Sequence, residues 1–143
     1  MTAGTAKGGA PNAKARKPGA NWRQDASNVE ALTEDVARAL ETGDLPLARR
    51  SFTECREQIL AHLASEEDVT FPAAERLAPA QRGPIRSLRV AHIGIRDDLE
   101  RVAQHLALGH VGAARAVFAA FLVSFAAHER LEDQLIELLR ESS

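Results

Sequence analysis

Apolar side chains recur every three or four residues along most of the chain, which is the pattern of amphipathic helices. No stretch of useful length alternates between apolar and polar residues as a half-buried strand does. The apolar stripes predict four helices, over residues 25–41, from Asp44 to about Phe71, from about Pro84 to Gly109, and from Gly109 onward. Glycine at the predicted helix ends and proline in predicted first turns support these boundaries.

The connections between the predicted helices indicate the fold class. Two of them are short, at Gly43 and Gly109, whereas residues 72–84 hold three prolines and a glycine and form the longest break. Short loops place consecutive helices antiparallel and side by side. We therefore predict an all-α protein, an antiparallel up-down-up-down four-helix bundle.

One short motif occurs twice, as His62-x-x-x-Glu66 and His128-x-x-x-Glu132, at an offset of 66 residues. The same offset relates other positions, including Val36 to Val102, Leu40 to Leu106, Phe52 to Phe118 and Ala61 to Ala127. A long period seen only twice indicates two equivalent halves rather than a solenoid. The sequence therefore predicts that the bundle consists of two duplicated helical hairpins.

Charge is distributed unevenly along the chain. Residues 1–20 contain four basic and no acidic side chains, which leaves 14 basic and 20 acidic side chains in the remainder. The first segment is rich in Gly, Ala, Pro and Lys and lacks apolar anchors. We therefore expect a disordered basic tail over residues 1–21 and one domain over residues 22–143. An acidic domain argues against nucleic acid as a partner, because phosphate binding needs a basic face.

Several features bear on where the protein works. The tail has no apolar core of a secretory signal, and the longest apolar run, residues 116–127, is too short to span a bilayer. A single cysteine, Cys55, excludes an internal disulfide and is compatible with a reducing compartment. We expect a cytoplasmic protein with no membrane partner. We expect a monomer or a homodimer through the last helix, where Val117, Ala120 and Ser124 would allow close contact.

The histidines and glutamates of the repeated motif suggest metal binding. Residues four apart lie on one helix face, so His62 with Glu66, and His128 with Glu132, can approach one ion together. His92 lies on the apolar stripe of the third helix, where a buried imidazole needs a polar partner. Imidazole and carboxylate suit iron, manganese or zinc, and bridging carboxylates favour iron and manganese. Surface ion pairs and a hydrogen-bonded core histidine are the alternatives.

These residues carry a resemblance to a known family. His62-Leu63-Ala64-Ser65-Glu66-Glu67 followed by Phe71-Pro72, and His128-Glu129-Arg130-Leu131-Glu132-Asp133, resemble the second and fourth helices of hemerythrin-like cation-binding bundles. The resemblance covers roughly residues 25–141. It implies a non-haem, usually di-iron, centre that handles dioxygen, nitric oxide or peroxide. It also implies a ligand set, which is His62, Glu66, His92, His128 and Glu132.

The chain departs from the family pattern in its first helix. By the 66-residue offset, the partner of His92 is residue 26, which is Ala26, and every histidine lies at position 62 or later. Asp25 is a candidate replacement, although a one-residue slip turns a side chain by about 100°. The consequence is an open coordination position on a di-iron centre, a mononuclear site, or a degenerate bundle that holds little metal.

Other assignments stay open from the sequence. Asp133 could replace Glu132 as a ligand, although the exact repeat favours Glu132, and Glu67 and Asp133 could instead orient a ligating imidazole. His105 and His110 are expected to face away from the site, and Cys55 is expected to pack in the core. Three functions follow: an iron protein that binds or senses a small ligand, a di-iron oxidase or peroxidase, and a metal-free protein-interaction module.

Overall fold

The computed structural model describes residues 22–142, and the predicted basic tail lies outside them. The long helices are α2 (Trp22–Thr42), α3 (Leu45–Ser65), α5 (Arg82–Ala107) and α6 (Val111–Ser142). Three short helical pieces join α3 to α5: a π-helix, η1 (Glu66–Thr70); a short α-helix, α4 (Phe71–Leu77); and a 3-10 turn, η2 (Pro79–Gln81). The described part of the chain contains no strand. The prediction of an all-α bundle is confirmed.

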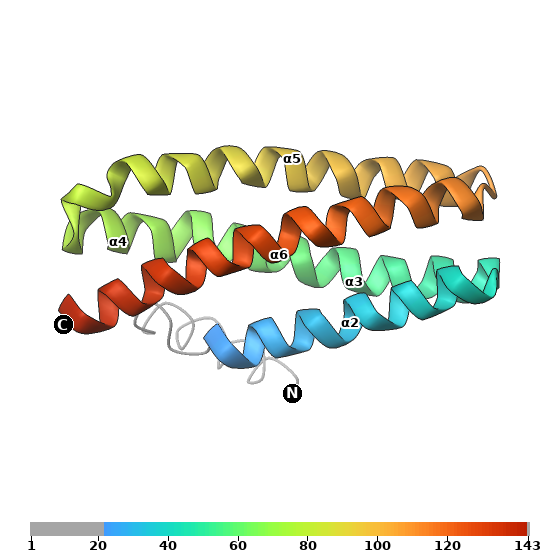
Figure 1. Cartoon of the computed structure of the whole chain (residues 1–143), viewed down its shortest axis with the longest axis horizontal. Coiled ribbons are helices and arrows are strands. Elements are labelled where there is room, and N and C mark those ends of the chain that lie inside the picture. Colours follow the sequence, from blue (N-terminus) through green and yellow to red (C-terminus); the bar gives the residue numbers. More distant parts are fainter. Residues whose placement is uncertain (1–21, 143) are drawn as a thin grey trace, which may run out of the picture.

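The long helices lie side by side along the long axis of the molecule (Figure 1). Helix α2 folds back onto α3, and α5 folds back onto α6, and these two pairs have the most extensive contacts. Further contacts of α2 with α6 and of α3 with α5 close the four helices into a ring. Helix α4 continues the line of α3, so that one long rod faces α5 (Figure 1).

Both tight turns depend on a glycine in the left-handed region. Gly43 has a φ of 76° and Gly109 has a φ of 77°, a conformation that is strained for residues with a Cβ. Between the turns, the Arg49 side chain of α3 donates hydrogen bonds to the carbonyls of Leu106 and Ala107, at 3.0 and 3.4 Å. A cation at these carbonyls satisfies the end of α5 and ties the two turns together.

The buried apolar residues form two separate clusters. The larger one, built around residues such as Ile59, Ile95 and Phe125, occupies the half of the bundle with the two glycine turns. The smaller one contains Phe71, Leu88 and Leu135 with their neighbours. Along α5 and α6, the histidines and the glutamate of the candidate site fall between members of these two clusters, and Glu66 falls between Leu63 of the larger cluster and Phe71 of the smaller one. The bundle interior is therefore two apolar layers with a polar layer between them.

The predicted break over residues 72–84 is partly wrong. The chain stays helical through Leu77, and the backbone leaves the helical region only at Ala78, with φ −138° and ψ 76°. Pro72 is tolerated because it sits in the first turn of α4, directly after the π-helix in which the Phe71 N–H donates to the Glu66 carbonyl. The widened turn thus accommodates a proline that would otherwise end the helix.

Helix α6 is unusual among the described helices in being long and apolar enough to cross a membrane: the span is Val111–Glu141, and an 18-residue stretch within it has a mean hydropathy of 1.6. Length and composition alone are weak indications, because the core helix of a helical bundle meets the same criterion. Helix α6 also places two polar residues, His128 and Glu132, in the bundle interior. The expectation that the chain has no membrane partner stays a prediction.

The turn geometry predicts opposite effects for two glycine substitutions. Gly43→Ala is expected to lower the free energy of unfolding by about 1 kcal/mol, because alanine is strained at positive φ. Gly94→Ala is expected to raise it by roughly 0.5–1 kcal/mol, because Gly94 lies within α5 with open space around it. Urea unfolding of the metal-free protein measures both changes. Equal midpoints for the two variants would contradict this account of the turn.

Candidate metal centre

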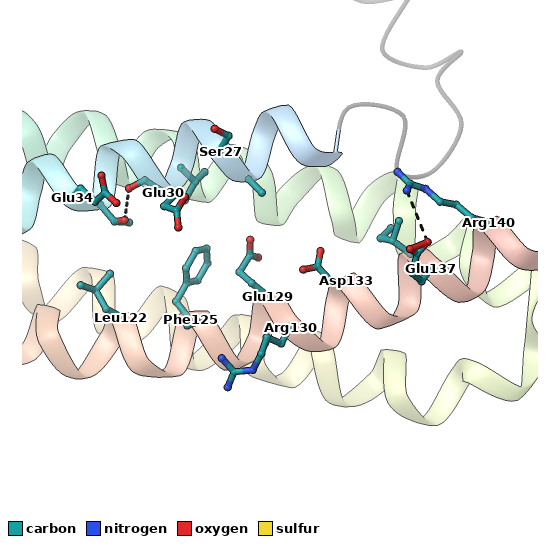
Figure 2. Close-up of a pocket in the computed structure, with 15 residues that line it drawn as sticks. Ser27, Glu30, Glu34, Leu122, Phe125, Glu129, Arg130, Asp133, Glu137 and Arg140 are labelled. Carbon is teal, nitrogen blue, oxygen red and sulfur yellow. Dashed lines mark hydrogen bonds and ion pairs between the residues drawn. The ribbon is translucent and has the colours of Figure 1, made fainter.

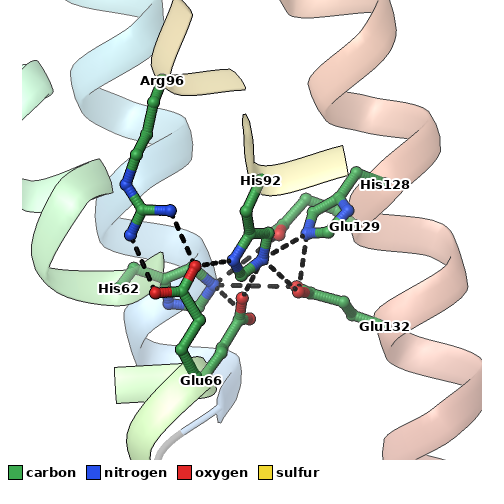
Figure 3. A network of polar contacts seen from close by, with 8 residues as sticks. His62, Glu66, His92, Arg96, His128, Glu129 and Glu132 are labelled. Atoms are coloured by element: carbon green, nitrogen blue, oxygen red, sulfur yellow. Dashed lines mark hydrogen bonds and ion pairs between the residues drawn. The ribbon is translucent and has the colours of Figure 1, made fainter. Parts of the chain in front are cut away.

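Five predicted ligands come together in the polar layer (Figure 3). All are buried, with exposed fractions between 0% for His92 and 8% for His62. They come from α3, the π-helix, α5 and α6, and the set is His62, Glu66, His92, His128 and Glu132. Helix α2 contributes no imidazole to the layer, as the sequence indicated. That these residues bind a metal stays a prediction at this point.

Two local structures aim the repeated motifs inward. His128 and Glu132 lie four residues apart on the regular helix α6, so that both side chains occupy one face. His62 is in the last turn of α3, whereas Glu66 is the first residue of the π-helix. A π-turn inserts an extra residue into a helix and is frequent at functional sites. Here it changes the helical register just after Glu66, where Glu67 turns toward α5.

The carboxylate of Glu66 lies between two imidazoles. Its Oε2 is 2.8 Å from Nε2 of His62, and its Oε1 is 3.0 Å from Nε2 of His92. Each oxygen therefore faces a different helix, Oε2 toward α3 and Oε1 toward α5. This is the geometry of a carboxylate that can bridge two ions.

Glu132 repeats this arrangement from α6. Its Oε2 is 2.6 Å from Nε2 of His128 and 3.5 Å from Nε2 of His92. Its Oε1 faces the other way, 3.8 Å from Nε2 of His62. The two buried glutamates thus each direct one oxygen toward His62 and the other toward the imidazoles of α5 and α6.

The donor atoms fall into two sets of four that share these glutamates. One set is Glu66, His92, His128 and Glu132, and the other is His62, Glu66, Glu129 and Glu132. Within each set the donor atoms lie within 4.8 Å of one another. Each set has the donor types and spacing to hold a metal ion.

Glu129 was missed by the sequence reasoning. Its Oε2 lies 3.7 Å from Nε2 of His62, and its side chain is 20% exposed. A signal was present, because residues 129 and 132 are three apart and share a helix face. Asp133, the alternative to Glu132, is exposed and belongs to neither set. Asp25, the candidate replacement on α2, is likewise exposed and outside both sets.

Burial and close opposite charges displace the pKa values of this cluster. Burial disfavours a charged His62, but the surrounding carboxylates outweigh burial and raise the pKa of His62 to about 12. The pKa of His92 rises to about 9 against the same opposition from burial. Burial raises the pKa of Glu66 to about 7. Although burial opposes its charge too, the three imidazoles hold the pKa of Glu132 well below its usual range.

These shifts have a common physical cause, which is a set of carboxylates enclosed in an apolar bundle. Burial also raises the pKa of Glu129, although His62 works in the other direction. Enclosed carboxylates require positive charge close by, in the form of protons or cations. The metal-free cluster obtains that charge from the imidazoles of His62 and His92.

The enclosed oxygen atoms fit a cation. Both oxygens of Glu66, Oε2 of Glu129 and Oε1 of Glu132 are inaccessible, and none accepts a hydrogen bond of good geometry in the described structure. Both Glu66 oxygens lie within 3.0 Å of an imidazole nitrogen, but neither contact has the geometry of a hydrogen bond. Atoms that coordinate the same metal ion can lie this close together without hydrogen-bond alignment. A buried acceptor without a partner destabilises a fold by about 1–3 kcal/mol. Ions between the helices would satisfy these atoms.

A charged pair on the outer side of His92 fixes the orientation of its ring. Oε2 of Glu67 lies 2.6 Å from Nδ1 of His92, and the Arg96 guanidinium donates to both oxygens of Glu67, at 2.7 and 3.0 Å. Arg96 is the main cause that lowers the pKa of Glu67 to about 2. An ionised Glu67 accepts a hydrogen bond from Nδ1–H of His92, which leaves Nε2 facing the centre as the nitrogen available to a metal ion. Glu67 therefore makes the contact with His92 that the orienting role considered from the sequence requires.

Aromatic rings enclose the polar layer on its apolar sides. The Phe71 ring lies 5.3 Å from the His92 ring, and the Phe125 ring stacks 6.5 Å from the His128 ring. Cys55 is fully buried in the larger apolar cluster, and burial raises the pKa of its thiol to about 12, as expected for a packing residue. His105 and His110 lie near the turn between α5 and α6 and belong to neither donor set.

The Glu67 contact predicts a weaker but not abolished metal site in Glu67→Gln. Loss of an orienting carboxylate is expected to reduce metal affinity by roughly 10–100-fold. Competition with a coloured chelator measures the change. Glu100→Gln is the matched control, because Glu100 also pairs with an arginine across α3 and α5, at 2.6 Å from Arg56, and belongs to neither donor set. Equal affinity in both variants would contradict the orienting role.

Comparison with known proteins agrees with this geometry. A family model described as the hemerythrin HHE cation-binding domain matches residues 19–138. No curated protein sequence and no solved structure matches the chain. The family match covers α2 to α5, most of α6 and every residue of the two donor sets. The chain therefore belongs to the hemerythrin HHE cation-binding domain family.

Proposed function

We propose that the protein holds two iron ions in its polar layer and binds a small ligand there, such as dioxygen, nitric oxide or peroxide. The observation that carries the proposal is the division of each shared carboxylate between two donor sets. One oxygen of Glu66 faces His62 and the other faces His92, and Glu132 is divided in the same way. Bundles that bind paired ions build their sites from inward-facing glutamates and histidines of this kind.

The chemistry of the donors supports iron. The two sets contain only imidazole and carboxylate, and Cys55 belongs to neither. Nitrogen and oxygen donors with bridging carboxylates suit iron or manganese better than zinc or copper. An iron pair supplies a reversible change of oxidation state and coordination positions for small ligands. The protein's residues hold the ions, orient His92 through Glu67 and exclude water with the aromatic rings.

The second donor set is where we place the exogenous ligand. This set has one imidazole, from His62, whereas the first set has two. Helix α2 has alanine at position 26, where the sequence repeat expects a histidine. The second ion therefore has fewer nitrogen ligands than the first, and it lies beside a groove between α2 and α6 through which a small molecule can reach it. A metal-free bundle would leave all the carboxylates of this set without a metal ion, and a single ion in the first set would leave Glu129 without one.

We also infer that the site follows the symmetry of a duplicated, up-down-up-down bundle. The 66-residue offset relates the motif at His62 and Glu66 to the motif at His128 and Glu132. These two motifs supply the shared carboxylates and one imidazole to each donor set. In this proposal the duplication produced the two ion positions, and the first hairpin later lost its histidine.

The iron content of the protein tests the proposal directly. Protein produced in iron-replete cells is expected to contain about two iron ions per chain, as paired-ion bundles do. His62→Ala is expected to lose about one of them, because His62 is the only imidazole of the second set. Elemental analysis of purified protein measures both.

His110→Ala is the matched control for this experiment, because His110 is exposed and outside both sets. It is expected to keep the full iron content. Removal of iron by a chelator is expected to lower the melting temperature, because a ligand bound only to the folded state stabilises that state. Less than about a tenth of an iron ion per chain, unchanged in His62→Ala, would contradict the proposal and favour a metal-free interaction module.

Binding of a small ligand is a separate prediction. Nitric oxide added to the reduced, iron-loaded protein is expected to produce a new visible absorption band that grows to saturation. The iron-free protein under the same conditions provides the control. An unchanged spectrum in protein that contains about two iron ions would contradict ligand binding while leaving the metal site intact.

A further inference from the structure

A groove of about 840 Å³ lies between α2 and α6, beside the second donor set. Its α2 wall includes Ala26, Glu30 and Thr33, and its α6 wall includes Phe125, Glu129 and Asp133. In Figure 2 the side chains of Glu129 and Asp133 extend from α6 toward α2, whereas Arg130 extends away. Ala26, at the position where the repeat predicts a histidine, thus lines the same groove as the carboxylate of Glu129.

The Glu129 carboxylate faces the second donor set rather than the solvent. Its Oε2 lies 3.7 Å from Nε2 of His62, and that oxygen is enclosed without accepting a hydrogen bond in the described structure. Two donors bound to one ion at about 2.1 Å each lie at most roughly 4.2 Å apart. The separation from His62 is therefore within the range for two ligands of one ion.

Helix geometry explains how neighbouring residues serve different ions. One residue along an α-helix rotates the side chain by about 100°. His128 therefore faces His92, with 3.1 Å between their Nε2 atoms, whereas Glu129 faces His62 of α3 (Figure 3). Glu132, three residues after Glu129, returns to the shared face and contributes to both sets.

Asp133 shows why Glu129 is the specific candidate. Asp133 lies four residues after Glu129, on the same groove and the same face of α6. It is exposed and belongs to neither donor set, whereas the Glu129 side chain is only 20% exposed. An acidic groove alone does not account for the inward position of Glu129.

We propose that Glu129 is a ligand of the second metal ion and replaces the histidine that is missing from α2. The inference rests on the proposed two-ion site and adds a ligand to it. It makes the second ion's environment three carboxylates and one imidazole, against two of each for the first ion. Such a harder donor set favours iron or manganese over zinc and copper, so the two positions differ in metal preference.

The test uses the folded, full-length chain and Mn²⁺ as a redox-stable probe. Equilibrium dialysis is expected to give two Mn²⁺ ions per wild-type chain, and electron paramagnetic resonance is expected to show a magnetically coupled pair. Glu129→Gln is expected to keep the first ion, to bind the second at least about tenfold more weakly, and to lose the coupled signal. Asp133→Asn, the matched control on the same helix face, is expected to behave as the wild type does.

A second variant separates loss of a ligand from general disturbance of the helix. Adding Ala26→His to Glu129→Gln is expected to restore tight binding of the second ion, because Ala26 lines the same groove. A double variant that still binds one ion would overturn the assignment of Glu129 as the replacement for residue 26. So would a folded Glu129→Gln protein that binds two ions with wild-type affinity. A wild-type chain that binds no metal would instead overturn the proposed function itself.

Discussion

The structure depends on two glutamates held in the interior of an apolar bundle. Glu66 and Glu132 are 3% and 2% exposed, and each has imidazole nitrogen within 3.0 Å. A buried charge destabilises a fold strongly unless opposite charge or hydrogen bonds compensate it. The histidines supply part of that compensation, and a pair of cations would supply the rest. The arrangement is therefore costly as structure alone and reasonable as a binding site.

The remainder of the fold holds this layer in place. Apolar clusters lie on both sides of it along the bundle, and the turn glycines with Arg49 fix the helix pairs at one end. The π-helix after Ser65 changes the register so that Glu67 reaches His92 while Glu66 stays in the centre. Rigid helices with locked side chains are what a precise metal site requires. Helix α2 contributes least to the site, because it has no histidine and leaves a groove between itself and α6 beside Glu129.

Most of the fold and the outline of the site could be predicted from the sequence, because helical periodicity and an exact repeat are strong signals. These signals identified five residues that lie together in the structure: His62, Glu66, His92, His128 and Glu132. The helical stretch after Phe71-Pro72 could not be predicted from the sequence, since proline usually ends a helix and a π-turn has no simple sequence pattern. Glu129 was missed because a motif search fixes spacing within one helix and cannot see which face meets a neighbouring helix.

Anomalous X-ray scattering from crystals of the iron-loaded protein tests the central claim most directly. The account predicts two iron peaks in the polar layer, roughly 3.5–4 Å apart as in paired-ion sites. Glu66 and Glu132 would each contact both peaks, with His62 on one ion and His92 and His128 on the other. A single peak, or iron bound only at the protein surface, would contradict it.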